Sequence, residues 1–230
     1  MRLRKVKGAE EAVNNSVFCV QTPTLYRGQW QSFFAKLREE NEEPPAAGPM
    51  PLHIEIGMGK GTFLMQLAAL HPNTNYLGIE LFPSVLFRAI QKIEEHPLSN
   101  LRFLCVNADS LTELFAEGEV DRIYLNFSDP WPKDRQADRR LTSACFLRKY
   151  EQILESGRGI AFKTDNRALF DFSVEQVREC GWDLTYCTYD LHAAGPDASV
   201  PESDLIMTEY EEKFAAAGNP ICMLEARTRI

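Results

Sequence analysis

The stretch Tyr124–Arg140, Y-L-N-F-S-D-P-W-P-K-D-R-Q-A-D-R-R, joins an apolar run to a turn that a strand cannot continue through. The run Arg122–Phe127 has the apolar, β-prone composition of a buried strand. Two prolines follow, and proline cannot donate to a sheet ladder and biases the residue before it away from helix. The sequence therefore predicts a strand that ends near Phe127 and a constrained turn that carries Asp129.

This turn is a candidate site, because ligands of open α/β sheets bind just outside the carboxyl ends of the strands. Trp131 could stack on a base or pack beneath the loop. A basic run follows, made of Lys133, Arg135, Arg139 and Arg140. Its position beside the turn favours contact with a polyanion over a merely solvated face.

Strand and helix patterns alternate through the middle of the chain. The expected strands are Leu52–Gly57, Asn75–Glu80, Leu101–Val106, Arg122–Phe127 and Gly159–Thr164. The expected helices are Lys60–Leu70, Ser84–His96, Ser110–Phe115, Thr142–Glu155 and Arg167–Cys180, with Ser84 and Thr142 as N-caps. Such alternation predicts an α/β fold with right-handed crossovers and a mostly parallel sheet.

The carboxyl-terminal part departs from this alternation. Two further strands, Asp183–Leu191 and Ile221–Arg229, enclose a loop at Ala193–Asp204 and a helix around Glu209–Ala217. Because no long helix pattern separates these strands, they could form an antiparallel edge of the sheet.

The amino-terminal part has a different character. We expect Met1–Thr24 to be loosely structured, Gly28–Glu43 to form an amphipathic helix packed on the core, and the Pro-rich Glu43–Pro51 to be a linker. The predicted organisation is an N-terminal extension, residues 1–51, followed by one domain, residues 52–230.

Composition limits the possible functions. The 230 residues are 44% hydrophobic and 25% charged, as in a soluble globular protein. The net charge of −8 argues against a protein that coats nucleic acid non-specifically, although it permits a local basic patch. We see no membrane span and no secretory signal. The six scattered cysteines are expected to be reduced thiols in a cytoplasmic protein without a metal site.

The first predicted strand leads into Glu55–Gly61, E-I-G-M-G-K-G, where Gly57 and Gly59 allow a tight turn and the close approach of a ligand. The G-x-G-x-G spacing differs from the dinucleotide fingerprint and from the P-loop. Glu80 ends the next strand, where an acid typically accepts hydrogen bonds from a ribose diol. Glu55 suits a cationic amino group, so the two acids together favour S-adenosylmethionine, a nucleoside with an amino-acid tail.

The third strand is followed by Asn107 and Asp109. Asn107 could hydrogen-bond an adenine or simply occupy a turn. Asp109 is better explained as the N-cap of the next helix.

Five motifs in register resemble the bacterial tRNA (guanine-N(7)-)-methyltransferases. They are E-I-G-M-G-K-G, G-I-E at Gly78–Glu80, L-N-F-S-D-P-W-P-K at Leu125–Lys133, F-K-T-D-N at Phe162–Asn166 and T-E-Y-E-E-K-F at Thr208–Phe214. The resemblance covers roughly Leu52 to Ala226. It implies a doubly wound, Rossmann-like class I methyltransferase fold, with a mostly parallel seven-stranded sheet and an antiparallel last hairpin. It also implies transfer of a methyl group from S-adenosylmethionine to N(7) of a guanosine in tRNA, in the variable loop.

The resemblance assigns expected roles to individual residues. With the two glycines Gly57 and Gly59, the cofactor would contact Glu55, Glu80, Asn107 and Asp129. The guanosine would contact Lys133, Asp165, Thr208, Glu209, Tyr210 and Glu211, and the tRNA would contact Arg135, Arg139 and Arg140. Thr208 and Glu211 also fit a helix capping box. The family often has Asp where this chain has Asn107, and the amide keeps an acceptor while it adds donors.

Methyl transfer to guanine N(7) needs few catalytic groups. Guanine N(7) has an in-plane lone pair and no proton, so it needs no general base. The methyl sulfonium is already activated, so the displacement needs no metal. We expect Asp129 to act as the catalytic residue by positioning and by stabilising the positive charge that develops on the purine.

Two alternatives stay open from the sequence. The first is another base methyltransferase that acts on an exocyclic amine, because N-F-S-D-P-W resembles the D-P-P-W-like loop of such enzymes. The second is a non-catalytic RNA-binding protein of the same fold. Either a monomer or a homodimer is compatible with the sequence.

Overall fold

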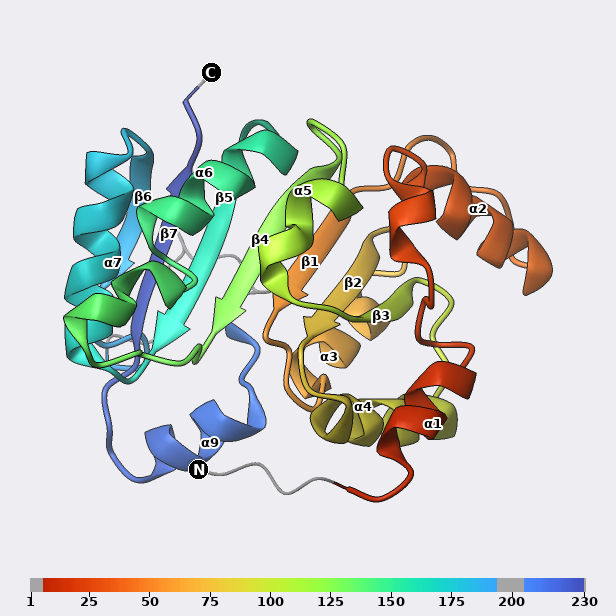
Figure 1. Cartoon of the computed structure of the whole chain (residues 1–230), viewed down its shortest axis with the longest axis horizontal. Helices are drawn as coiled ribbons and strands as arrows, with labels where there is room; N and C mark the ends of the chain where they lie inside the picture. The colour runs from red at the N-terminus through yellow and green to blue at the C-terminus, as the bar shows by residue number, and fades with distance from the viewer. Residues whose placement is uncertain (1–5, 194–204, 230) are drawn as a thin grey trace.

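The computed structural model describes residues 6–193 and 205–229, and it contains one seven-stranded sheet in the order β3-β2-β1-β4-β5-β7-β6 (Figure 1). The strands are β1 Leu52–Ile56, β2 Asn75–Glu80, β3 Leu101–Cys105, β4 Val120–Asn126, β5 Leu154–Thr164, β6 Asp183–Thr188 and β7 Cys222–Arg227. The first five strands pair in parallel, and β7 runs antiparallel to both of its neighbours, β5 and β6. The predicted fold class, including the antiparallel last hairpin, is confirmed.

Helices cover both faces of this sheet (Figure 1). They are α1 Ala9–Asn15, α2 Trp30–Glu40, α3 Thr62–Leu70, α4 Pro83–Glu95, α5 Leu111–Leu114, α6 Ala144–Ile153, α7 Arg167–Glu179 and α9 Glu209–Ala216. Successive strand residues alternate between two apolar clusters, so α2, α5, α6 and α7 pack in one cluster, whereas α1, α3 and α4 pack in the other. Strands β1, β2 and β3 are therefore mostly buried on both sides and are near-continuous apolar runs, whereas the edge strand β6 is exposed or half-buried throughout.

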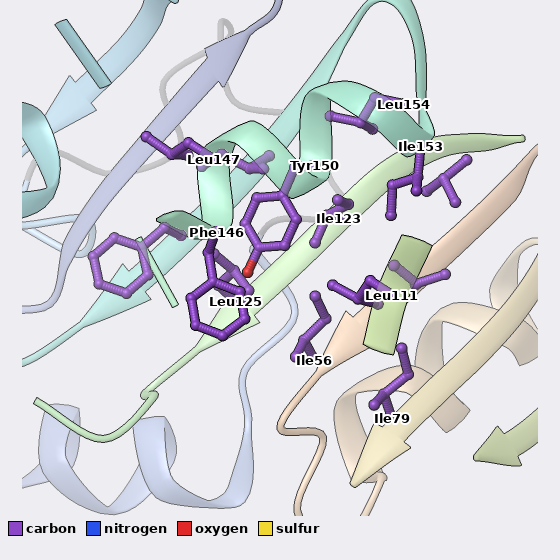
Figure 2. Packing of buried hydrophobic residues seen from close by; sticks show 14 of the residues in the cluster. Ile56, Ile79, Leu111, Ile123, Leu125, Phe146, Leu147, Tyr150, Ile153 and Leu154 are labelled. Carbon is purple, nitrogen blue, oxygen red and sulfur yellow. The ribbon is translucent and has the colours of Figure 1, made fainter. Parts of the chain in front are cut away.

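Helix α6 shows how the sequence specifies this packing. Its buried residues Phe146, Leu147, Tyr150 and Ile153 follow the spacing of one helical face, and they meet β4 across the interface shown in Figure 2. The hydroxyl of Tyr150 donates a hydrogen bond to the carbonyl of Leu141 at 2.9 Å, which satisfies its polar end at the edge of the core.

The described part of Met1–Thr24 is more ordered than the sequence indicates. It contains α1, which packs on α4 through its buried residues Ala9 and Val13. Further along, the N–H of Phe103 donates to the carbonyl of Phe18 at 2.8 Å, and the N–H of Val20 donates to the carbonyl of Phe103 at 2.9 Å. The expectation of a loose segment is wrong because this segment is fixed by contacts that are distant in sequence and invisible to periodicity.

Helix α2 confirms the predicted amphipathic helix packed on the core. Its residue Trp30 is fully buried, and the indole N–H donates to the carbonyl of Leu114 at 3.0 Å. The Glu119 carboxylate accepts hydrogen bonds from the N–H groups of Gly28 (2.8 Å), Trp30 (3.0 Å) and Ala116 (2.8 Å). Glu119 thereby ties the start of α2 to the turn before β4.

Two predicted N-caps are wrong. Helix α4 begins at Pro83, whose fixed backbone angle suits the first turn, and the hydroxyl of Ser84 instead accepts the N–H of Val6 at 3.0 Å. Helix α6 begins at Ala144, and the hydroxyl of Thr142 is buried against that of Ser173 at 2.6 Å. In both cases the side chain binds a tertiary partner rather than its own helix.

Replacing Glu119 tests the attachment of α2. We expect Glu119→Ala to lower the free energy of unfolding by about 2 kcal/mol, because three N–H groups lose a charged acceptor. Urea denaturation measures this. Glu117→Ala is the control, since Glu117 is an exposed carboxylate nearby, and it should change the value by less than about 0.5 kcal/mol. Equal urea midpoints for the two variants would contradict the proposed attachment.

Candidate functional site

The candidate site lies at the carboxyl edge of the parallel strands. Glu55 is in β1 just before the glycine loop, Glu80 ends β2, Asn107 follows β3, Asp129 follows β4 and Asp165 follows β5. Parallel pairing of these strands brings their carboxyl ends to one edge of the sheet. Figure 1 shows α9 beyond the arrowheads of β4 and β5 at this same edge.

The glycine loop after β1 depends on backbone conformations that favour glycine. Gly57 has φ +76° and Gly59 has φ +60°, both in the left-handed region. This turn directs the N–H of Gly59 to Glu80, whose carboxylate accepts it at 3.1 Å and accepts the N–H of Phe82 at 3.0 Å. Glu80 thus holds the loop in place, and its oxygens keep further lone pairs for a ligand.

Burial raises the pKa of Glu80 above its ordinary value. The N–H groups of Phe82 and Gly59 act in the opposite direction, and the nearby Asp129 carboxylate adds a smaller increase. Asp129 itself is exposed. The edge therefore gathers negative charge that a cationic ligand would relieve.

Glu55 is the most deeply buried acid of the glycine-loop region, with 1% of its surface exposed. Asn126 donates a hydrogen bond to its Oε1 at 2.9 Å, whereas its buried Oε2 has no partner among the described residues. Burial raises the pKa of Glu55 to about 8, although the Asn126 hydrogen bond and the positive charge of Lys163 lower it. A buried acceptor without a donor fits a ligand that brings its own cationic N–H groups.

The turn after β4 is strained on both sides of Asp129. Phe127 has φ +52° and Trp131 has φ +41°, and neither is glycine. Each such residue costs roughly 1–3 kcal/mol, so surrounding contacts must hold the turn in this conformation. The N–H of Phe127 donates to the carbonyl of Lys163 at 2.8 Å.

Arg140 supplies the other support of this turn. Its guanidinium donates to the carbonyls of Pro130 (3.1 Å) and Trp131 (3.0 Å), and it lies 4.3 Å from the ring centre of Phe172. In this structure Arg140 is a half-buried loop anchor, while its neighbour Arg139 is exposed and lies 5.1 Å from the centre of the Trp131 ring.

The basic run continues on the surface. Lys133 and Arg135 are exposed at the start of a short 3-10 turn, Asp134–Arg139. With Arg139 they make up the exposed basic residues of the segment that follows Asp129 in the chain, which we call the basic face.

The third strand ends differently from the expectation for Asp109. Asn107 is the capping residue, because its Oδ1 accepts the N–H of Asp109 at 3.0 Å, and Asp109 instead pairs with Lys149 at 2.8 Å. The predicted cap at Asp109 is therefore wrong. Asn107 is exposed beside the end of β3.

The segment that begins α9 closes the site on its other side. Thr208 caps the helix, accepting the N–H of Glu211 at 3.0 Å in a complete capping box. Tyr210 packs on Phe127 with 5.0 Å between ring centres, and its hydroxyl donates to Asp165 at 3.4 Å. Tyr210 therefore joins the turn after β4 to the acid after β5.

The two glutamates of this segment have different surroundings. Glu209 is exposed and binds Lys60 at 2.7 Å, Lys92, and the hydroxyl of Thr62 at 2.9 Å. Hydrogen bonds from Lys60 and Lys92 lower the pKa of Glu209 to about 2.

Glu211, by contrast, is fully buried. It pairs with Lys163 at 2.6 Å and with Nε2 of His192 at 3.1 Å. In this structure its contacts are with the protein interior.

Three residues that matter to this geometry were not predicted: Asn126, Lys163 and His192. A signal was present for Lys163, since a lysine within the apolar strand G-I-A-F-K-T has to find a partner when that strand is buried. The partner of Asn126 depends on strand register, which the sequence does not reveal.

The acids of this cluster line neither of two cavities in the described part of the chain. One, of about 590 Å³, is lined by Arg27, Thr112, Phe115, Glu117, Arg148, Glu151, Gln152 and Ile153. Another, of about 320 Å³, lies near the end of β3, with Cys19, Pro83 and Val106 in its lining. We place the site by the convergence of its acids rather than by these volumes.

The described part of the chain contains neither a candidate metal cluster nor a membrane-spanning helix. Across residues 6–193 and 205–229, we find no cluster of three or more His, Cys, Asp or Glu side chains suited to a metal ion. Within the same ranges, every helix is too short or too polar to cross a membrane.

Comparison with known proteins agrees with this geometry. A family model described as "Putative methyltransferase" matches residues 49–224. Two solved structures share the fold. The 16S rRNA methyltransferase KamB has a TM-score of 0.61 and 14% sequence identity, and the match covers 86% of this chain and 94% of that one. An antibiotic-related methyltransferase has a TM-score of 0.57 and 20% identity, and the match covers 78% of this chain and 88% of that one.

Closer relatives match over the full length. A tRNA (guanine-N(7)-)-methyltransferase of Lachnoclostridium phytofermentans is 50% identical over 226 residues, 98% of each chain. One of Bacillus subtilis is 43% identical over 230 residues, 100% of each chain. Identity of this extent over the whole length means that the chain belongs to the tRNA (guanine-N(7)-)-methyltransferase family.

Proposed function

We propose that this protein transfers a methyl group from S-adenosylmethionine to N(7) of a guanosine in tRNA, in the variable loop. The observation that carries the proposal is the buried Glu55 carboxylate with one oxygen unpartnered among the described residues, beside a glycine loop and in a chain of this family. S-adenosylmethionine, a nucleoside with an amino-acid tail, requires a site for its cationic amino group.

The residues at this edge suit the parts of the cofactor, which supplies an activated methyl group on a positively charged sulfur. Glu55 would accept hydrogen bonds from the amino group, and the backbone at Gly57 and Gly59 allows the ligand to approach closely. Glu80 would hold the ribose hydroxyls, and Asn107 would serve the adenine.

The guanosine side is formed by the turn after β4, the acid after β5 and the start of α9. Tyr210 would bound the pocket beside Asp165, and Thr208 would contribute its backbone and hydroxyl groups. Lys133 is exposed beside Asp129 and would donate to guanine O6 or to a phosphate.

The two glutamates of the α9 segment also belong to this proposal. Glu209 would contact the guanosine while it keeps its ion pairs with Lys60 and Lys92. Direct contact between Glu211 and the guanine would require it to leave Lys163, so we assign Glu211 first to holding the segment in place.

Alignment and charge stabilisation are the main tasks of the protein in this reaction. Holding two reactants in attack geometry contributes about 7–11 kcal/mol to a reaction whose nucleophile needs no deprotonation. Asp129, exposed on a strained turn at the edge, would stabilise the positive charge that develops on the purine.

The tRNA would approach over the basic face formed by Lys133, Arg135 and Arg139. The carboxylates at the edge of the sheet would repel the phosphates of the tRNA, so the tRNA backbone would contact the basic face instead. Arg140 would contribute indirectly by holding the Pro130–Trp131 carbonyls.

A labelling experiment tests the reaction. The full chain is incubated with methyl-labelled S-adenosylmethionine and unmodified tRNA, and the nucleosides are separated after digestion. We expect labelled 7-methylguanosine. Label on an exocyclic amine would instead support the alternative base methyltransferase. The absence of label together with the absence of S-adenosylmethionine binding by calorimetry would support a non-catalytic RNA-binding protein.

Removal of the Asp129 carboxylate tests its electrostatic role. We expect Asp129→Asn to lower kcat by about 100-fold, because the charge that faces the developing cation is lost while the side chain keeps its size. Single-turnover methylation at saturating tRNA measures this. Asp134→Asn removes an exposed carboxylate from the same loop and should keep at least half of the wild-type rate. An Asp129→Asn enzyme as fast as this control would refute the assignment.

The basic face predicts a specific salt dependence. We expect the double variant Arg135→Ala with Arg139→Ala to bind tRNA more weakly and to reduce the slope of log K against log[salt] by about 1–2 units, since two phosphate contacts are lost. Filter binding from low to moderate salt measures the slope. Lys36→Ala, which removes an exposed charge from α2, should leave the slope unchanged. If the double variant keeps the wild-type slope, the arginines do not contact phosphate.

A further inference from the structure

Helix α9 is attached to the protein in an unusual way. Glu211 is its one fully buried residue among those the structure describes, and it is charged. Phe214 and Ala215 are only partly buried at the margin of the apolar core. The helix that carries the proposed guanosine contacts therefore combines one buried charged attachment with partly buried apolar contacts.

The partners of Glu211 come from two other parts of the chain. Lys163, on β5, is 2% exposed and places its Nζ 2.6 Å from Oε2 of Glu211. The same ammonium donates to the carbonyl of Ile206 at 2.8 Å, and His192 approaches Oε1 of Glu211 at 3.1 Å. Lys163 thus binds the segment both before and within α9.

The exposed attachment of α9 is different in kind. Glu209 pairs with Lys60 and Lys92, but its side chain is 42% exposed. Ion pairs in water contribute little to stability, because solvent screens them and the side chains lose freedom. The contact between Lys163 and Glu211 is, by contrast, a buried attachment of α9, and it acts beside the partly buried apolar residues Phe214 and Ala215.

Lys163 also belongs to the cofactor side of the site. It lies beside Asn126 in the register of β4 and β5, and Asn126 donates to Glu55 at 2.9 Å. Its ammonium lies 5.3 Å from the ring centre of Phe63, at the start of α3 behind the glycine loop. A row of buried polar side chains, Glu55, Asn126, Lys163 and Glu211, thus crosses the sheet from the proposed cofactor acid to α9.

We infer that Lys163 is a positioning residue: through Glu211 and the carbonyl of Ile206, it docks the segment 206–211 against the carboxyl edge, so that Thr208 and Tyr210 face the substrate. This inference rests on the proposed function for the role of the segment, while the docking itself does not. A neutral residue at position 163 would leave the Glu211 carboxylate buried without a cation, and the helix would move into water to hydrate it.

Hydrogen exchange of the full chain without ligands tests the docking. In Lys163→Met we expect the amides of residues 209–216 to exchange at least tenfold faster than in the wild type, while those of β1 and β4 keep their protection. Lys36→Met, which removes an exposed ammonium from α2, should leave α9 unchanged. Unaltered exchange of α9 in Lys163→Met would overturn the inference, whatever reaction the protein catalyses.

A second variant separates positioning from simple stability. Lys163→Met combined with Glu211→Gln removes both buried charges, so unfolding stability should recover most of what the single variant loses. The double variant still lacks the ammonium that binds the carbonyl of Ile206, so we expect the segment 206–211 to stay mispositioned. The kcat/KM for tRNA should then be at least tenfold below wild type, and the KM for S-adenosylmethionine should change less than the KM for tRNA. Recovery of both stability and kcat/KM in the double variant would overturn the inference, and Lys163→Arg should restore part of the docking because the charge is kept.

Discussion

The burial of the Glu55 carboxylate is the constraint on which the rest of the site depends. An acid in the centre of a parallel sheet is costly to ionise, and here its pKa rises to about 8. One oxygen has Asn126 as a donor, and the other has none among the described residues. We propose that the cationic amino group of a ligand hydrogen-bonds to this second oxygen.

We propose that the same edge of the sheet binds both substrates. In the proposed function, the glycine loop and Glu80 would hold the nucleoside cofactor, and the strained turn of Asp129 would face the base. Lys163 lies between them, close to Glu55 and paired with Glu211. The two parts thus share a buried polar row, which supports a model in which cofactor site and substrate segment are organised together.

Much of this arrangement could be predicted from the sequence, and the limits have physical causes. The acids at strand ends were predictable because parallel strands bring their carboxyl ends to one edge. The capping box of α9 was predictable because it is local, at Thr208 and Glu211. The burial of Glu211 was not, since it depends on where α9 docks. The predicted caps at Ser84 and Thr142 are wrong for a similar reason, because both hydroxyls hydrogen-bond to residues distant in the sequence.

The charge state of Glu55 is tested most directly by counting the protons released when S-adenosylhomocysteine, which keeps the amino group of the cofactor, binds. With a pKa of about 8, the free carboxyl is mostly protonated at pH 7, and a bound ammonium would lower that pKa and expel the proton. Calorimetry at pH 7 in buffers of different ionisation enthalpy should show release of about one proton per site, and release should fade above pH 8, where the free acid is already ionised. Glu55→Gln should abolish the release. Binding by the wild type without proton release, or with the same release as Glu55→Gln, would contradict the assignment of Glu55 as the acceptor for the amino group.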